Sequence, residues 1–186
     1  MIGTLAHRVL QYWNFSDPAG TWRERIVAVC REDLAEQWAG AMTGIENELQ
    51  ELFQTFMASG PYRELQRATI LGREVPFVMP WEGNRLWAMG YGPQAQADSS
   101  LSPIAHHPSP ASCVMEGVID VVYRLDGKVH LADYKTDRVK DSEVAARAAD
   151  YEGQARIYRE AVSRCLGITD VGVQVIFLRN GKAVSV

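Results

Sequence analysis

Several features that define common protein classes are missing from this sequence of 186 residues. Its three cysteines, Cys30, Cys113 and Cys165, are widely spaced and form no CxxC pattern. They fit neither a disulfide framework nor a zinc or iron–sulfur site, and they favour a reducing cytoplasm. No apolar run approaches the length of a membrane span, and no signal peptide opens the chain. We therefore expect a cytoplasmic protein that does not act in a membrane.

The sequence also lacks an excess of positive charge. Its net charge of −4 argues against a free-standing, high-affinity binder of nucleic acid, although a local basic patch would be compatible. No GxxxxGK[ST] loop is present, which excludes a P-loop ATPase. The apolar fraction of 47% and the charged fraction of 23% are ordinary for a soluble globular protein, and the length fits one domain over residues 1–186.

Helical periodicity dominates the first third of the chain. The spacing of apolar residues predicts helices over residues 3–15, 17–40 and 43–60, and a short fourth helix over 62–68. The second begins with an Asp-Pro start signal and ends at Gly40, a stop signal. We expect the aromatic residues on these helices to be core residues, namely Trp13, Trp22, Trp38, Phe53 and Phe56.

The pattern then changes to strands. "TILGREVPFVMPW" (69–81) reads as a strand, and "GVIDVVYRLDGKVHLADYKTD" (117–137) reads as a hairpin that turns at Asp126-Gly127. A further pair of strands closes the chain across an Asn-Gly turn at 180–181.

A long amphipathic helix over 141–167 separates the last two groups of strands. Residues 92–112 are rich in Pro, Ser and Ala and read as a mobile insertion, so His106 and His107 within it are expected to be solvated. The order of elements predicts an α/β (α+β) domain, with a mainly helical part over 1–68 and a central mixed β-sheet over 69–186.

The hairpin contains charged residues where plain sheet interior is expected. Asp120 lies in the first strand, and Asp133 and Lys135 lie two apart in the second, so the latter two share a face. Charges in such a position cost free energy unless they are paired or bind a metal. From these residues alone, a half-exposed hairpin with polar side chains facing solvent is an equal alternative.

Other polar residues lie oddly in the same scheme: His7, Glu74, Gln154 and Tyr158. Gln154 and Tyr158 are four apart and share one face of the helix that follows the hairpin, and Tyr151, three residues before Gln154, lies on that face too. Two carboxylates and an imidazole can hold Mg²⁺ or Mn²⁺, and an amine nearby can orient water or neutralise a phosphate. The set is coherent with metal-dependent hydrolysis of a phosphodiester.

In order, these residues lie in the motifs "GTLAHRVL", "GREVPF", "GVID", "DYKTD" and "YEGQARIY". The sequence of motifs resembles the C-terminal nuclease domain of RecB and AddA, within the PD-(D/E)xK nuclease superfamily. This resemblance implies a restriction-endonuclease-like core. It also implies that His7, Asp120 and Asp133 bind Mg²⁺, for which Mn²⁺ may substitute, together with the backbone carbonyl of Tyr134.

The resemblance further assigns roles in catalysis. It implies that Asp120, Asp133 and Lys135 are catalytic and that Gln154 and Tyr158 support the site or touch DNA. Glu74 matches a motif position, and its role stays open. The four cysteines that hold an iron–sulfur cluster in some relatives are missing, so no cluster is expected.

The expected function is therefore that of a metal-dependent, exonuclease-type DNA nuclease in double-strand break repair. The expected partners are DNA, as single strands or ends, and a superfamily 1 helicase in the same or another chain. The sequence fits either an excised nuclease domain or a small stand-alone relative. The alternative is a catalytically silent nuclease fold that binds DNA or a protein partner, although every motif residue is intact.

Overall fold

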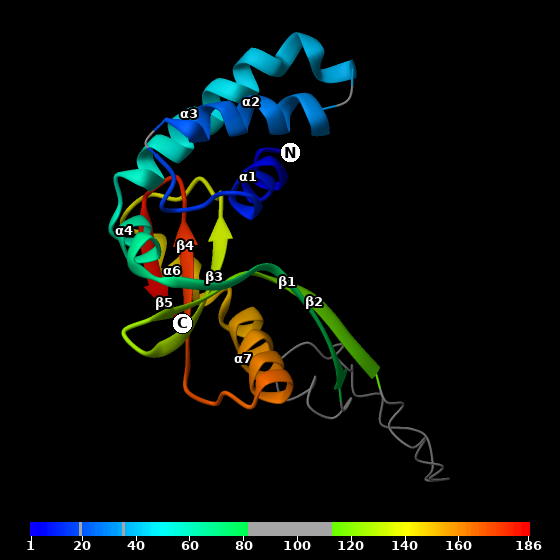
Figure 1. Ribbon diagram of the computed structural model, residues 1–186, viewed down its shortest axis with the longest axis vertical. Helices are drawn as coiled ribbons and strands as arrows, with labels where there is room; N and C mark the ends of the chain where they lie inside the picture. The colour runs from blue at the N-terminus through cyan, green and yellow to red at the C-terminus, as the bar shows by residue number, and fades with distance from the viewer. Residues whose placement is uncertain (19, 35, 82–112) are drawn as a thin grey trace, which may run out of the picture. The chain divides into compact units, whose positions relative to one another are not determined.

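The computed structural model describes residues 1–18, 20–34, 36–81 and 113–186 (Figure 1). The chain forms two compact units, one of residues 1–75 with 118–186 and one of residues 76–117. The expected insertion at 92–112, with its two histidines, lies outside the described residues.

Five helices build the first third of the chain: α1 (Ile2–Gln11), α2 (Thr21–Asp33), the 3-10 helix η1 (Glu36–Ala41), α3 (Met42–Met57) and α4 (Gly60–Arg67). The hydroxyl of Ser59 begins α4 by accepting a hydrogen bond from the backbone N–H of Tyr62 at 3.2 Å. The prediction of one helix over 17–40 is wrong at its end. Leu34 adopts an extended conformation, so α2 stops there and Gly40 falls within η1.

The core between these helices and the sheet is apolar. Leu5, Val9 and Leu10 of α1 are buried in it, which fits their spacing along one helical face. Of the aromatic residues expected in the core, four are buried: Trp13, Trp22, Phe53 and Phe56. The expectation was wrong for Trp38, which is 41% exposed because it lies on η1 rather than on a packed α-helix.

Among the described residues, the sheet has five strands in the order β1-β2-β3-β4-β5. They are β1 (Thr69–Trp81), β2 (Cys113–Leu125), β3 (Lys128–Lys135), β4 (Val171–Phe177) and β5 (Lys182–Ser185). Strand β3 runs antiparallel to β2 and parallel to β4, and β5 runs antiparallel to β4. The predicted mixed sheet flanked by helices is confirmed.

The predicted turn between β2 and β3 is also confirmed. Asp126 and Gly127 both have positive φ angles, 50° and 81°, as a two-residue hairpin turn requires. The turn fixes the register in which Val121 lies opposite Ala132. Asp120 is one residue past that pair, so the hairpin places it beside the Asp133–Lys135 end of β3.

Two helices connect the parallel strands β3 and β4. They are α6 (Val144–Ala149) and α7 (Glu152–Leu166), which Gly167 ends in a left-handed conformation. The prediction of one helix over 141–167 is therefore correct about where the helix ends. It is wrong about a single continuous helix, because turn residues at 150–151 separate α6 from α7. In Figure 1 the arrowheads of β3 and β4 point toward α1.

The period of two along β3 sends its side chains to different layers. Ala132 and Tyr134 join the core formed with the N-terminal helices. Asp133 and Lys135 pair in register with Val175 and Phe177, which pack on the opposite face with α6 and Tyr151. Within the described residues, no helix is long and apolar enough to cross a bilayer.

Candidate active site

Helix α1 brings His7 to the carboxyl end of β3. The imidazole Nε2 lies 3.0 Å from the carbonyl oxygen of Tyr134. A Cβ at Gly3 would lie 3.1 Å from the hydroxyl of Thr136, which is a tight contact, so the glycine eases the close approach of the helix.

His7, Glu74 and Asp120 form one group, here called the His7 cluster. One possible ligand atom from each side chain lies within 4.8 Å of the other two. Nδ1 of His7 is 3.2 Å from Oδ1 of Asp120 and 3.8 Å from Oε1 of Glu74. The other oxygen of Asp120 accepts a 2.6 Å hydrogen bond from the backbone N–H of Tyr134. That bond fixes the Asp120 carboxylate against β3.

Glu74 enters the cluster from a strained backbone. Its φ is 47°, a left-handed value in the middle of β1 that a residue with a side chain rarely adopts. Strain of this kind costs on the order of 1–3 kcal/mol and is concentrated at functional sites. The side chain is 27% exposed, so the cluster keeps contact with solvent.

The electrostatics of the cluster favour a cation. The neutral tautomer that donates from Nε2 to Tyr134 leaves a lone pair on Nδ1 facing two carboxylates. Burial lowers the pKa of His7, but the hydrogen bond and charge of Asp120, with smaller effects of Tyr134 and Glu74, raise it overall. Burial and the charge of Asp120 also raise the pKa of Glu74. A proton or a metal ion would relieve the same repulsion.

A second group, here called the Lys135 network, lies at the same end of β3. Nζ of Lys135 is 2.6 Å from Oδ2 of Asp133 and donates to Oε1 of Gln154 at 3.1 Å. Nε2 of Gln154 donates to the hydroxyl of Tyr158 at 2.6 Å. That hydroxyl contacts Oδ1 of Asp133 at 3.5 Å, which closes a ring of four side chains.

The network is buried beneath α7. Burial raises the pKa of Asp133, and the charge of Asp120 adds to that effect against the opposing effect of Lys135. Asp120 and Asp133 each lie one residue beyond the paired Val121 and Ala132, so the two groups adjoin one another. Burial and the charge of Asp133 also raise the pKa of Tyr158, which keeps its hydroxyl protonated as a donor.

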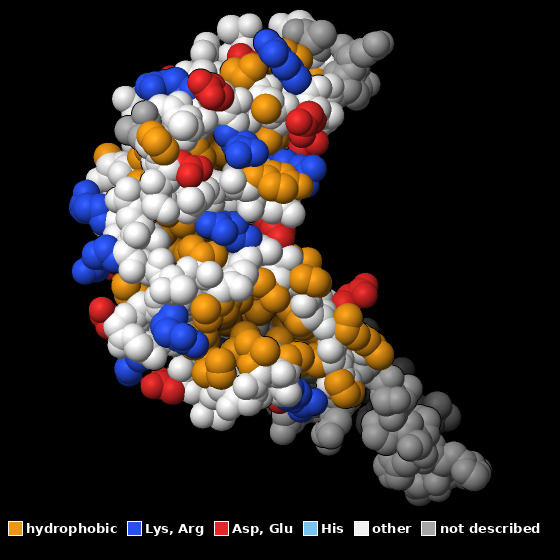
Figure 2. Space-filling view, viewed as in Figure 1, with side chains coloured by type: hydrophobic (Ala, Val, Ile, Leu, Met, Phe, Trp, Pro, Cys, Tyr) orange, Lys and Arg blue, Asp and Glu red, His pale blue; other side chains and the backbone are white. Residues whose placement is uncertain are grey.

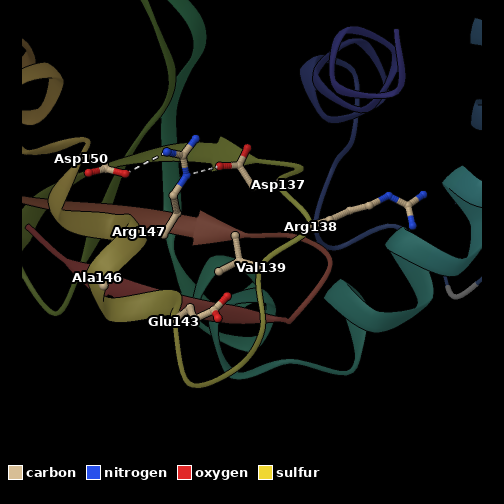
Figure 3. Close-up of a pocket in the computed structure, with 7 residues that line it drawn as sticks. All are labelled: Asp137, Arg138, Val139, Glu143, Ala146, Arg147 and Asp150. Carbon is tan, nitrogen blue, oxygen red and sulfur yellow. Dashed lines mark hydrogen bonds and ion pairs between the residues drawn. The ribbon is translucent and has the colours of Figure 1, made fainter.

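Tyr151 supports the ammonium group of Lys135 from outside the ring of four. Nζ of Lys135 lies 4.3 Å from the centre of the Tyr151 ring, within cation–π distance. The Tyr151 hydroxyl donates to Asp137 at 2.8 Å and accepts from Arg147 at 3.0 Å. Arg147 in turn lies between Asp137 and Asp150, beside a pocket of about 660 Å³ (Figure 3). These contacts hold the ring beneath the lysine.

The sequence placed every residue of the two groups among its candidates. The structure brings His7, Asp120 and the Tyr134 carbonyl together, and it brings Asp133, Lys135, Gln154 and Tyr158 together. Among the described residues, Asp133 is not part of the His7 cluster, and its carboxylate faces Lys135 instead. Glu74, whose role stayed open, joins the cluster.

Sequence reasoning missed the contact of Tyr151 with Lys135. It placed Tyr151 on the same helical face as Gln154 and offered no partner. The helix in fact ends before Tyr151, which is the N-cap residue of the next helix, α7. A tyrosine three residues before the glutamine of the motif was the available signal.

The matching family model is that of the PD-(D/E)XK nuclease superfamily, and it covers residues 1–184. The chain belongs to this superfamily. Its predicted fold is thereby confirmed, and the superfamily supports a nuclease module with hydrolase chemistry. The relatives described next confirm its resemblance to the helicase-associated nucleases.

Curated relatives are each named as one subunit of an ATP-dependent helicase/nuclease. The protein from Anoxybacillus flavithermus is 28% identical over 165 residues, which cover 86% of this chain and 11% of that relative. The protein from Bacillus velezensis is 26% identical over 193 residues, covering 98% of this chain and 14% of that relative. The Clostridium perfringens protein is 22% identical over 167 residues, covering 89% of this chain and 12% of that relative. The chain therefore spans only a small part of the relatives it matches.

Proposed function

We propose that this nuclease-superfamily module is a divalent-metal-dependent deoxyribonuclease of the exonuclease type. The observation that carries the proposal is that the His7 cluster and the Lys135 network lie side by side at the carboxyl end of β3. The His7 cluster offers oxygen and imidazole donors with excess negative charge, and the Lys135 network offers an ammonium group held in place. Carboxylate oxygens with one imidazole suit Mg²⁺ or Mn²⁺.

The proposed ligands are His7, Asp120, Asp133 and the carbonyl of Tyr134, with Glu74 as a further donor. For the Tyr134 carbonyl to serve together with His7, the imidazole must turn so that Nε2 no longer donates to that carbonyl. When bound, the cation polarises a phosphoryl oxygen and lowers the pKa of a bound water. Asp120 is held for this role by the backbone N–H of Tyr134. The donor set fits the ion because the cluster gathers two carboxylates around a histidine lone pair.

The reaction is the hydrolysis of a phosphodiester. Oxygen of a water forms a bond to phosphorus, one P–O ester bond breaks, and the departing oxygen takes up a proton and leaves as a hydroxyl. Lys135 neutralises negative charge that develops around phosphorus, and such preorganised stabilisation is a large part of catalysis. Asp133, Gln154 and Tyr158 hold the ammonium group in position for this.

The partner proposed for this module is a superfamily 1 helicase in the same or another chain, acting in repair of double-strand breaks. The names of the relatives support this, since each joins a helicase and a nuclease. The net charge of −4 gives the module little electrostatic hold on duplex DNA, which fits delivery of the strand by a motor.

The test is digestion of linear single-stranded and double-stranded DNA in Mg²⁺, in Mn²⁺ and in EDTA. We expect cleavage that needs the metal, is slow without a partner and favours single strands. Lys135→Met is the matched control, because it removes the amine and keeps a side chain of similar length. Metal-dependent cleavage that is equally fast in this variant would refute the assignment, and DNA binding without cleavage in the wild type would favour a silent nuclease fold.

A further inference from the structure

Beside the His7 cluster, helix α1 exposes an aromatic ring that the proposed mechanism does not use. Tyr12 directly follows the last residue of α1 and is 47% exposed. Tyr12 lies three residues after the buried Val9, so its ring sits at the edge of the apolar face of α1 and leaves about half of its surface in solvent. Large exposed aromatic rings next to a reactive site are a feature of nucleic-acid binding surfaces.

Two arginines flank this ring. The guanidinium carbon of Arg8 lies 4.8 Å from the centre of the Tyr12 ring, and that of Arg25 on α2 lies 5.9 Å from it. Arg25 is exposed, and Arg8 is partly exposed. A guanidinium plane stacks on bases as an aromatic ring does, and its charge attracts phosphate. The three side chains together form what we call the Tyr12 platform.

A pocket leads from the platform to the His7 cluster. It has a volume of about 430 Å³ and is lined by Gly3, Thr4, His7, Arg8, Gln11, Asp33 and Glu74. Arg8 thus belongs to both features: its guanidinium lies near the Tyr12 ring, and the same side chain lines the pocket. It is held there by a 2.9 Å hydrogen bond to Gln11 and by Asp33 at 3.5 Å.

Helical geometry makes the path continuous. Thr4, Arg8 and Gln11 follow at steps of four and three residues, so they lie on one face of α1 with His7 at its edge. Tyr12 is four residues beyond Arg8 and lies about 7.5 Å along the helix axis from His7, at 1.5 Å per residue. This is close enough for neighbouring nucleotides of one strand to reach both places.

We infer that the Tyr12 platform and the adjoining pocket bind a single strand of DNA next to the bond to be cleaved. The inference rests on the proposed nuclease function and names the residues that hold its single-stranded substrate. An aromatic side chain can stack only on bases whose faces are free, as in a single strand. In a duplex those faces are already covered by the neighbouring base pairs. On the face seen in Figure 2, the described Lys and Arg side chains are interspersed with Asp and Glu, so stacking rather than a broad basic surface would supply the grip.

The test measures binding apart from cleavage. A fluorescein-labelled oligothymidylate, single-stranded or annealed to its complement, is titrated with protein in EDTA at low salt, and anisotropy gives the affinity. We expect Tyr12→Ala to weaken single-strand binding at least about fivefold, since one stacked base contributes that much or more. Duplex binding should change less than about twofold, because phosphate contacts dominate it.

Two variants serve as controls. Tyr12→Phe keeps the ring and should bind single strands like the wild type. Trp38→Ala removes another exposed aromatic residue, 41% exposed, and should have no effect. If Tyr12→Ala unfolds in a thermal melt, Arg25→Gln replaces it, because this surface change on α2 should weaken single-strand binding while the ring remains.

The inference is overturned if Tyr12→Ala and Arg25→Gln bind single strands as the wild type does. It is also overturned if Tyr12→Ala weakens single-strand and duplex binding equally, or if the wild type binds no single strand. Wild-type protein that binds oligothymidylate through Tyr12 in EDTA and yet fails to cleave DNA in Mg²⁺ would refute the proposed function alone.

Discussion

The Lys135 network and the His7 cluster, which lie at the same end of β3, differ in their balance of charge. In the Lys135 network, one carboxylate meets one ammonium group at 2.6 Å, and the remaining polar atoms form a closed ring with Gln154 and Tyr158. In the His7 cluster, two carboxylates face one imidazole, and the pKa values of His7 and Glu74 are both raised. The network neutralises its carboxylate with its own ammonium group, whereas the cluster gains from any added cation.

This difference shows how one small site can combine rigidity with metal affinity. If one member of a buried ion pair is removed, the other is left as an uncompensated charge. Lys135 is therefore needed for the stability of the fold as well as for the proposed catalysis. A metal site needs unneutralised donors, and the fold tolerates them because His7 and Glu74 stay partly exposed, at 31% and 27%. Variants of either group should therefore separate stability from metal binding.

The largest expected effect comes from Lys135→Met and Asp120→Asn. Each should lower cleavage by about 100- to 1000-fold, the usual cost of one charge-stabilising group. They should differ in stability. Lys135→Met leaves Asp133 buried without its cation and should lower the free energy of unfolding by about 3 kcal/mol. Asp120→Asn keeps an oxygen for Tyr134 and removes a repelling charge, so it should be neutral or stabilising.

Urea denaturation of both variants without metal checks this contrast. An equal loss of stability in the two variants would mean that Asp120 is a structural residue of the hairpin, and that the two groups do not differ in the way described.

The second effect is the pH dependence of stability without metal. The pKa of His7 is raised from 6.5 in the folded state. Its contribution is therefore fully present below pH 6.5 and is lost as pH rises through the folded value. We expect the free energy of unfolding to fall over this window and to fall less in His7→Gln. Saturating Mn²⁺ should reduce the fall, because the ion replaces the proton. Identical pH profiles for the wild type and His7→Gln would argue against a charged His7 cluster.

The smallest effect concerns the ring beneath Lys135. Tyr151→Leu should lower kcat by about 2- to 30-fold, the range of one cation–π contact, with little change in KM. Tyr151→Phe keeps the ring and should retain most of the activity.

A spectroscopic measurement separates this effect from general loosening of α7. The ring current of Tyr151 should shift the Cε protons of Lys135 upfield in the wild type and in Tyr151→Phe, but not in Tyr151→Leu. Equal spectra for the three proteins would show that the ring does not position the lysine.

Much of this architecture could be predicted because its signals are local. The Asp126-Gly127 turn sets a register, and that register puts Asp120 beside Asp133 and Lys135 without knowledge of the rest of the chain. The spacing of Gln154 and Tyr158 likewise follows from one turn of helix. The presence of a mixed sheet and of an N-terminal helical part also followed from periodicity.

What could not be predicted depends on tertiary geometry. Glu74 reaches the His7 cluster through a positive φ that the residue type does not suggest. The contact of Tyr151 with Lys135 depends on a break between α6 and α7. The apolar pattern runs on through this break, and the nearest glycine, Gly153, lies within α7 rather than at the end of α6. Asp133 faces Lys135 rather than His7. Sequence spacing alone does not determine which of these two neighbours it contacts.

The central claim is that the cation binds at the His7 cluster, and that Asp133 is the one ligand the Lys135 network adds. Titration of ¹⁵N-labelled protein with Mn²⁺ tests it most directly, because the ion broadens the amide signals nearest to it even when binding is weak. We expect the signals of His7, Asp120 and Tyr134 to broaden first in the wild type and in Lys135→Met, and this pattern to be lost in Asp120→Asn. Broadening centred on Asp137 and Asp150, or an unchanged pattern in Asp120→Asn, would contradict the account.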